Sequence, residues 1–445
     1  MFVCIAIFLC MDPVCRFHCR SRNGVLMTAR NAFYAQSGGV TAVINASACG
    51  VIETARKHRD KIRNVLAGRN GIVGALTEEL IDTGRESRED IAALRYTPGG
   101  AFGSCRYKLA DPEKDRKEFE RLLEVFKAHD IGYFFYNGGG DSADTCYKIS
   151  RFSSVMGYPI QAIHIPKTID NDLPLTDCCP GFGSVAKYIA VSTIEASFDV
   201  RSMCRTSTKI FVMEVMGRHA GWIAAAGGLA ENYGIPVVIL FPEVEFNEKK
   251  FLAQVEEKVR RHGYCTVVVS EGCKYPDGTF LADQGDRDAF GHAHLGGAAP
   301  VVANMICEEL GYPFHWAVAN YLQRSARHVA SAIDVEQAYE VGAAAVNLAL
   351  QGKNSVMPTI VRLSGEPYRY EIGVADLGNV ANVEKMMPKS FISDDGYGIT
   401  EECRKYLQPL VQGENYPPYK MGLPEYVTLQ NTMVSKKLPP FDKKI

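Results

Sequence analysis

Short apolar runs alternate with segments of helical periodicity along most of this 445-residue chain. Runs of strand length lie at 31–35, 131–136, 159–165, 209–215, 235–241, 265–270 and 315–321. Helical patterns lie at 41–56, 114–129, 180–197, 219–229, 247–262, 297–310 and 335–350. Such alternation builds βαβ units and mostly parallel sheets, and about ten units are too many for one sheet. We therefore predict an α/β fold of two Rossmann-like three-layer domains, with the active site in the cleft between them.

The domain boundaries follow from this pattern. We expect one domain to comprise 27–180 together with about 325–385, and the other to comprise 181–324. Beyond about residue 385 the pattern weakens into a segment rich in Pro, Tyr and Lys. We expect 386–445 to be a C-terminal extension that packs on the surface or on a partner subunit.

Composition excludes several classes of function. The net charge of −2 gives no support to a nucleic-acid surface or a polybasic membrane patch. No stretch approaches the roughly 18 apolar residues of a spanning helix, so we expect no membrane association. The 14 cysteines are scattered and include no CxxC pair with zinc spacing, which is typical of a protein from the reducing cytoplasm.

The N-terminal segment is unusual because the apolar run at 1–10 precedes the basic run at 16–22. A signal peptide has the reverse order. Met27 opens the stretch that leads into the first predicted strand. We hypothesise that Met27 is the natural start and that 1–26 is a non-native or disordered extension.

Residues 166–172, Pro-Lys-Thr-Ile-Asp-Asn-Asp, follow the apolar run at 159–165. Ligands bind at the carboxyl ends of strands in open α/β sheets. Two carboxylates, Asp170 and Asp172, beside the ammonium of Lys167 could supply a base, a metal ligand and a cation for phosphoryl transfer. The alternative is a solvated turn in which these residues only bend the chain.

Two glycine-rich turns join predicted strands to helices. Gly38-Gly39 follows the first strand, and Gly138-Gly139-Gly140 precedes Asp141 and Ser142. Such turns let backbone N–H groups approach an anion closely, although each could be only a tight turn. Asp141 could cap the helix, but its carboxylate would also repel a phosphate placed there.

Polar residues also end other predicted strands. Arg218, in Met216-Gly217-Arg218-His219-Ala220-Gly221, could hold a phosphate or a sugar hydroxyl, or could be a surface arginine. Glu271 could accept hydrogen bonds from sugar hydroxyls. Tyr321 and Arg324 end a third strand, and Arg106 follows a glycine-rich turn. A composite site in an α/β protein has this distribution.

Six features of the chain resemble the phosphofructokinase family and occur in the same order as in that family. They are Gly38-Gly39, GGGDS at 138–142, PKTIDND at 166–172, MGRHAG at 216–221, Glu271 and YLQR at 321–324. The resemblance spans roughly 31–330, and PKTIDND with MGRHAG is its most specific part. The lysine at position 167 resembles the bacterial pyrophosphate-dependent branch of the family. The ATP-dependent enzymes have a glycine at this position. The resemblance implies a cytoplasmic, Mg²⁺-dependent enzyme that reversibly transfers a phosphoryl group from pyrophosphate to fructose 6-phosphate. It also implies a homodimer or homotetramer.

The resemblance also implies roles for individual residues. Asp170 would be the general base, Lys167 would stabilise the transition state, and Asp141 would exclude ATP by charge. Arg106 would contact the transferring phosphate and Gly38 would line the pyrophosphate site, both in the 27–180 domain. Mg²⁺ or its waters would be held by Asp141 and Asp172. The substrates would be bound by Gly38, Thr168, Ile169, Asp170, Lys209, Met216, Gly217, Arg218, Glu271, Tyr321 and Arg324, and the 181–324 domain would hold the sugar phosphate.

The chain departs from the family pattern at three positions. Gly140 stands where the ATP-dependent branch has a metal-contacting aspartate, and Asp141 comes one residue later. Lys209 and His315 stand where arginines are usual, the first of them supplied by a neighbouring subunit. A pyrophosphate enzyme that prefers sedoheptulose 7-phosphate is therefore an open alternative.

Other readings of the sequence compete. An ATP-dependent phosphofructokinase is disfavoured by Lys167 and Asp141. A nicotinamide-dependent oxidoreductase is disfavoured because the chain has no GxGxxG turn. A sugar-phosphate sensor would need no base, so the pair of Asp170 and Lys167 speaks against it.

Overall fold

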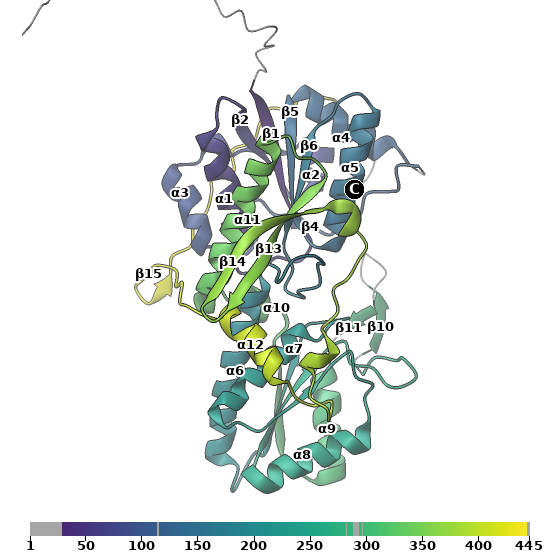
Figure 1. Ribbon diagram of the computed structural model, residues 1–445, viewed down its shortest axis with the longest axis vertical. Coiled ribbons are helices and arrows are strands. Elements are labelled where there is room, and N and C mark those ends of the chain that lie inside the picture. The colour runs from purple at the N-terminus through teal and green to yellow at the C-terminus, as the bar shows by residue number, and fades with distance from the viewer. Residues whose placement is uncertain (1–28, 114, 282, 288–292, 296, 443–445) are drawn as a thin grey trace, which may run out of the picture.

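The computed structural model describes residues 29–113, 115–281, 283–287, 293–295 and 297–442 (Figure 1). The hypothesis about residues 1–26 lies outside the described residues. Two main sheets divide the described chain, and helices cover both faces of each (Figure 1). The predicted α/β fold with two Rossmann-like domains is confirmed.

The first sheet has eight strands in the order β14-β13-β6-β5-β1-β2-β3, with β4 paired to β1. Its strands are β1 (Arg30–Ser37), β2 (Ile62–Gly68), β3 (Leu80–Asp82), β4 (Ser104–Cys105), β5 (Ile131–Gly138), β6 (Gln161–Pro166), β13 (Val356–Gly365) and β14 (Tyr368–Asp376). The pairs β2–β3 and β13–β14 are antiparallel, and the other pairs are parallel.

The second sheet has four parallel strands in the order β12-β7-β9-β8. These are β7 (Ile210–Val215), β8 (Val237–Leu240), β9 (Cys265–Ser270) and β12 (Phe314–Val318). Two short pairs stand apart, β10 (Asp283–Arg287) with β11 (Ala293–Leu295) and β15 (Tyr419–Lys420) with β16 (Leu423–Pro424).

Side chains that alternate along the strands fill a core on each face of the sheets. In β1, Ala32 and Tyr34 join one core and Phe33 and Ala35 join the other. The first sheet is covered on one face by α1 (Ile44–Lys57) and α11 (Ala332–Leu350), and on the other by α4 (Lys117–Ala128) and α5 (Gly140–Val155). The second is covered by α6 (Phe182–Met203) and α7 (Trp222–Ala226), and by α8 (Glu248–His262) and α9 (Ala298–Leu310).

The remaining helices are short. They are α2 (Ile72–Leu76), α3 (Arg88–Ala93), α10 (Asn320–Ser325) and α12 (Glu401–Leu410). Within the described residues, no helix has both the length and the apolar character needed to cross a membrane.

Glycines let α1 and α11 pack closely. A methyl group at Gly50 would lie 2.2 Å from the Tyr339 carbonyl oxygen, and one at Gly342 would lie 2.2 Å from the Ser47 carbonyl oxygen. Both distances are far below van der Waals contact, so only glycine fits at either position. This contact fixes the helix layer beneath the Gly38-Gly39 turn, because α1 begins directly after that turn.

The C-terminal part of the chain after about residue 385 packs on the rest of the described chain. It contains α12, which lies beside α6 and α7 (Figure 1), and its Phe391, Cys403 and Leu407 are buried in the main core. The last described residues pack on the first sheet of the same chain, since the Asp82 N–H donates to the Thr432 carbonyl. The β13–β14 hairpin was not predicted.

Two of the predicted boundaries that differ from the structure lie at the carboxyl ends of strands in the second sheet. The strand expected at 315–321 ends at Val318, and its last residues belong to α10. The helix expected at 219–229 begins at Trp222 because 217–221 form a turn at the carboxyl end of β7.

Candidate active site

A cleft of about 1370 Å³ lies where the carboxyl ends of strands from both sheets face one another. Strands β1, β5 and β6 of the first sheet and β7, β9 and β12 of the second each lead into residues that line it. This is the position at which open α/β sheets bind ligands. The cleft is therefore the candidate active site.

Most of the PKTIDND residues line this cleft directly after β6, which ends at Pro166. The Lys167 N–H donates to the Gly138 carbonyl, and the Asp170 N–H donates to the Thr168 hydroxyl oxygen at 3.1 Å. Asn171 is fully buried and has a φ of 56°, a left-handed conformation that asparagine tolerates better than most residues. This bend lies between Asp170 and Asp172, and both aspartates line the cleft.

Lys167 and Asp170 have strongly shifted pKa values. Burial, together with the carboxylates of Asp172 and Glu271, raises the pKa of Asp170 to about 7, although Lys167 opposes the shift. Burial lowers the pKa of Lys167 to about 8, and Asp170 and Asp172 oppose that shift. A carboxyl group that titrates near neutrality can accept a proton in one direction of a reaction and return it in the other.

The Gly38-Gly39 turn brings cationic groups together. The Lys167 ammonium donates to the Gly39 carbonyl at 2.7 Å. A methyl group at Gly39 would lie 2.6 Å from a guanidinium nitrogen of Arg324 and 3.7 Å from one of Arg106. A side chain at Gly39 would therefore displace the Arg324 guanidinium from this position. Three cations around one glycine turn make a site for an anion with several charges.

Asp141 stands in the first turn of α5, on the cleft wall next to this turn. Its carboxylate lies 3.1 Å from the Lys108 ammonium, and both side chains are about half exposed. Negative charge is favourable at a helix N-terminus. In the cleft, the same carboxylate repels any phosphate group that approaches α5.

The opposite wall comes from the second sheet. Met216, Arg218 and Glu271 follow β7 and β9, and the Ser270 hydroxyl donates to the Gly217 carbonyl at 2.6 Å. Burial raises the pKa of Glu271 to about 7, while the Gly217 N–H and Arg218 oppose the shift. Uncharged or charged, Glu271 offers oxygens for hydroxyl groups of a ligand.

Tyr321 and Arg324 reach the cleft from α10 rather than from a strand end. The Arg324 guanidinium lies 3.8 Å from the centre of the Tyr321 ring. Burial lowers the pKa of Arg324, and the nearby Arg106 lowers it further. The stacked arginine therefore spans the gap between the second sheet and the Gly38-Gly39 turn.

The structure brings nearly all the residues predicted from the sequence into the cleft lining. They are Gly38, Arg106, Asp141, Lys167, Thr168, Ile169, Asp170, Asp172, Met216, Arg218, Glu271, Tyr321 and Arg324. Gly217 lies directly behind the lining, between Met216 and Arg218. Lys209 is not in the cleft of this chain: it precedes β7 at the amino end of the sheet, and its ammonium donates to the Cys204 carbonyl.

Residues 382–384 also line the cleft and were missed from the sequence. The Asn382 amide donates to Asp144 at 3.1 Å, and Glu384 lies 3.1 Å from the His219 ring. These residues lie in an irregular segment that is distant in sequence from every motif. Neither periodicity nor a strand end marked them.

The described residues contain no cluster of three or more His, Cys, Asp or Glu side chains arranged to hold a metal ion. However, one carboxylate oxygen of Asp172 is buried and has no hydrogen-bond partner. Burial raises the pKa of Asp172, and the Thr168 hydroxyl opposes this by hydrogen bonding. Such a donor set fits Mg²⁺, which takes one or two carboxylates and completes its shell with water and phosphate oxygens.

The two domains, the basic glycine turn and the shifted pKa values of Asp170 and Lys167 define an α/β protein that handles phosphate groups. A family model described as "Phosphofructokinase" matches residues 31–349. The chain belongs to the phosphofructokinase family.

Curated relatives are similar over nearly the whole chain. The pyrophosphate–fructose 6-phosphate 1-phosphotransferase of Methylococcus capsulatus is 70% identical over 93% of this chain and 99% of its own length. That of Halomonas elongata is 64% identical over 93% of this chain and 100% of its own. The crystal structure of the pyrophosphate-dependent phosphofructokinase from Nitrosospira multiformis is 66% identical, covers 93% of this chain and 100% of its own, and has a TM-score of 0.87.

Proposed function

We propose that this enzyme transfers a phosphoryl group reversibly from pyrophosphate to the 1-hydroxyl of fructose 6-phosphate. The products are fructose 1,6-bisphosphate and phosphate. The observation that carries the proposal is the pair of Lys167 and Asp170 at the end of β6, facing the Gly38-Gly39 turn across the cleft floor. The high identity to curated enzymes of this name supports it over most of the chain.

Asp170 is the proposed general base. It takes the proton of the sugar 1-hydroxyl as that oxygen bonds to the terminal phosphorus of pyrophosphate, and the bridging P–O bond breaks to release phosphate. In the reverse direction the protonated carboxyl returns the proton to the sugar oxygen. A pKa of about 7 supports both roles, because both protonation states are populated at neutral pH.

Lys167, Arg106 and Arg324 form the proposed pyrophosphate site with Gly38. Their positive charges meet the negative charge that spreads over the phosphate oxygens during transfer. Asp141 occupies the side of this site where a nucleotide would extend, and its carboxylate disfavours further phosphates there. The proposed donor is therefore pyrophosphate rather than ATP.

The sugar phosphate is proposed to lie against the opposite wall. Met216 and Arg218 follow β7, and Glu271 offers oxygens to the sugar hydroxyls. Tyr321 and Arg324 close that side from α10. Thr168 and Ile169 lie between the two substrates on the cleft floor.

Mg²⁺ is the proposed cofactor, with Asp172 and Asp141 holding the ion or its waters. When bound, Mg²⁺ neutralises charge on the pyrophosphate oxygens. The unpartnered carboxylate oxygen of Asp172 supports this assignment.

We further propose a homodimer or homotetramer in the cytoplasm. Lys209 lies outside the cleft of its own chain, as expected of a residue that serves a neighbouring subunit. The edge strand β12 exposes His315 and Trp316, and Trp316 is 47% exposed. The cysteines in the described part of the chain are all free, which suits a reducing compartment.

The proposal is tested by identifying the products. Purified enzyme with pyrophosphate, fructose 6-phosphate and Mg²⁺ should form fructose 1,6-bisphosphate and phosphate, which ³¹P NMR distinguishes. Asp170→Ser should lose turnover about 10³-fold or more while still binding fructose 6-phosphate, since removal of a general base mainly affects the chemical step. Asp394→Ser, a surface change of the same type, should behave as wild type. Unchanged turnover in Asp170→Ser would refute the assigned base.

A further inference from the structure

Residues 382–385 connect the domain of the first sheet to the domain of the second. They run beside residues 167–177, which we call the catalytic loop. Asn382 contacts Asp144 of α5, and Glu384 contacts His219 after β7. The main-chain N–H of the next residue, Lys385, donates to the Asp172 carbonyl at 2.6 Å. The Lys385 carbonyl accepts from the Trp222 indole N–H at 3.3 Å. The main chain of Lys385 therefore joins the catalytic loop to α7, which covers one face of the second sheet.

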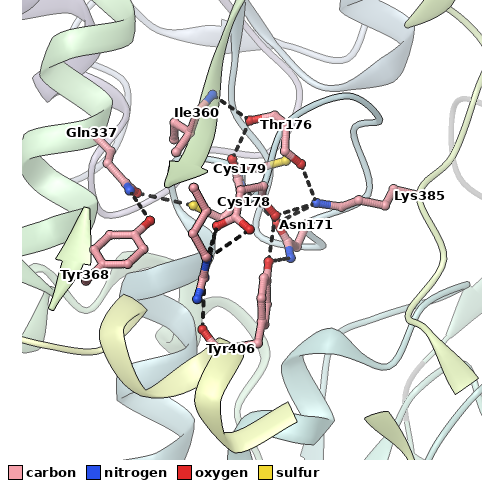
Figure 2. Close-up of polar contacts among 11 residues, drawn as sticks. Asn171, Thr176, Cys178, Cys179, Gln337, Ile360, Tyr368, Lys385 and Tyr406 are labelled. Carbon is pink, nitrogen blue, oxygen red and sulfur yellow. Dashed lines mark hydrogen bonds and ion pairs between the residues drawn. The ribbon is translucent and has the colours of Figure 1, made fainter. Parts of the chain in front are cut away.

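The Lys385 ammonium points into the same loop from behind (Figure 2). It donates to the Thr176 carbonyl at 3.0 Å and to the Asp177 carbonyl at 2.9 Å, and it lies 3.4 Å from the Asn171 amide oxygen. These three oxygens match the three donors of an ammonium group. Lys385 does not line the cleft, and its three donors are directed at this loop, so we assign it no direct contact with a substrate.

Asn171 is the residue through which Lys385 reaches the two aspartates. Its amide nitrogen donates to the Tyr406 hydroxyl at 2.8 Å, and its amide oxygen accepts from the Cys179 N–H at 2.9 Å. The side chain is thus held on both sides while the backbone takes its left-handed turn. Because Asn171 separates Asp170 from Asp172, a change in its position moves both carboxylates.

Further hydrogen bonds hold Thr176 and Asp177, whose carbonyl groups bind the Lys385 ammonium (Figure 2). The Tyr406 hydroxyl donates to the Asp177 carbonyl at 2.7 Å, and the Arg362 guanidinium donates to the Asp177 carboxylate at 3.0 Å. The Thr176 hydroxyl accepts from the Ile360 N–H at 3.0 Å. Strand β13 and helix α12 therefore fix 176–177, and Lys385 transmits that position to Asn171.

We propose that Lys385 is a positioning residue for the reaction, which holds the Asn171 turn so that Asp170 meets the sugar hydroxyl. The inference rests on the proposed function and extends it to a residue outside the cleft lining. A misplacement of a reacting group by about 1 Å can cost about 100-fold in rate. Loss of Lys385 should therefore reduce the chemical step more than it reduces substrate binding.

The test compares Lys385→Met with wild type and with Lys389→Met, an exposed lysine four residues later. Lys385→Met keeps a long unbranched side chain, one atom shorter than that of lysine, and removes its three donors. We expect kcat to fall about 10- to 100-fold while KM for fructose 6-phosphate stays within about threefold. Lys389→Met should match wild type in both constants.

A double-mutant comparison separates positioning from general destabilisation. In the Asp170→Ser background the base is absent, so Lys385→Met should change the residual rate by less than about twofold. A purely structural role predicts a lower Tm and an equal loss of rate in both backgrounds. If Lys385→Met does not fold, Tyr406→Phe releases the other anchor of Asn171 and should give the same separation of kcat from KM at a smaller scale.

The outcomes are distinct. A folded Lys385→Met enzyme with wild-type kcat, or one that loses rate equally with and without Asp170, overturns the inference and leaves the proposed function intact. A wild-type enzyme that does not turn over pyrophosphate with fructose 6-phosphate overturns the proposed function and this inference with it.

Discussion

Acidification should slow the forward reaction through the protonation of Asp170. Burial raises the pKa of this carboxyl to about 7, and the base must be ionised to accept the proton of the sugar hydroxyl. The ionised fraction is then about a half at pH 7, about a tenth at pH 6 and about a hundredth at pH 5. The forward kcat should fall by the same factors below its plateau at high pH.

The reverse reaction should depend on pH with the opposite sign. There the carboxyl of Asp170 must carry the proton that it returns to the sugar oxygen. The reverse kcat should therefore be highest below pH 7 and fall about tenfold for each pH unit above it. One group thus predicts two opposing profiles that cross near its pKa.

The assay is the initial rate in each direction between pH 5.5 and 9, with all substrates saturating so that kcat reports on the bound enzyme. Glu271 also has a pKa of about 7, so Glu271→Gln is the control. It should weaken substrate binding and keep the two opposing limbs of kcat, shifted to lower pH because the Glu271 carboxylate helps to raise the pKa of Asp170. Profiles that fall on the same side of neutrality in both directions would refute Asp170 as the shared base, as would a wild-type forward kcat that does not fall between pH 7 and pH 5.5.

Three further predictions concern single side chains of the cleft. Lys167→Met should lower kcat/KM for pyrophosphate by about 100-fold or more in initial-rate assays, because a buried cation at the donor oxygens is lost, whereas Lys353→Met at the surface should have no effect. Asp141→Gly should increase affinity for MgATP about tenfold, as measured by calorimetry. The change removes a carboxylate and frees the Lys108 ammonium 3.1 Å away. Unchanged affinity would contradict the role of Asp141 in donor choice. Asp170→Asn should stabilise the protein by up to about 4 kcal/mol at pH 8 and so raise Tm, because the wild type must keep a buried carboxylate ionised there although its pKa is raised to about 7. The gain should shrink as the pH falls and vanish by about pH 3, where Asp170 is protonated both folded and unfolded.

Much of the fold could be predicted because the signals are local. Asn247 was expected to begin a helix, and its side chain accepts a hydrogen bond from the Lys250 N–H at the start of α8. The apolar runs became β5, β6, β7 and β9, which are buried on both faces and therefore mostly apolar. The β13–β14 hairpin was missed because β14, at the edge of the sheet, alternates partly buried and exposed residues.

The cleft residues were predictable to the extent that they follow strands or belong to compact motifs. Asp170 and Glu271 lie at carboxyl ends of strands, and parallel sheets bring such ends together. Lys209 could not be placed in this way because it lies at the amino end of β7. Glu384 and Lys385 belong to an irregular segment, and their side-chain hydrogen bonds and ion pairs join them to residues more than 160 positions away, so only the tertiary structure reveals them.

The most direct test of donor selection is the initial rate with fructose 6-phosphate and Mg²⁺ when either pyrophosphate or ATP is the only donor. The cationic turn at Gly38-Gly39 and the carboxylate of Asp141 predict turnover with pyrophosphate and none above background with ATP. Turnover with ATP alone would contradict the roles assigned to Lys167 and Asp141, although the fold and the family would stand.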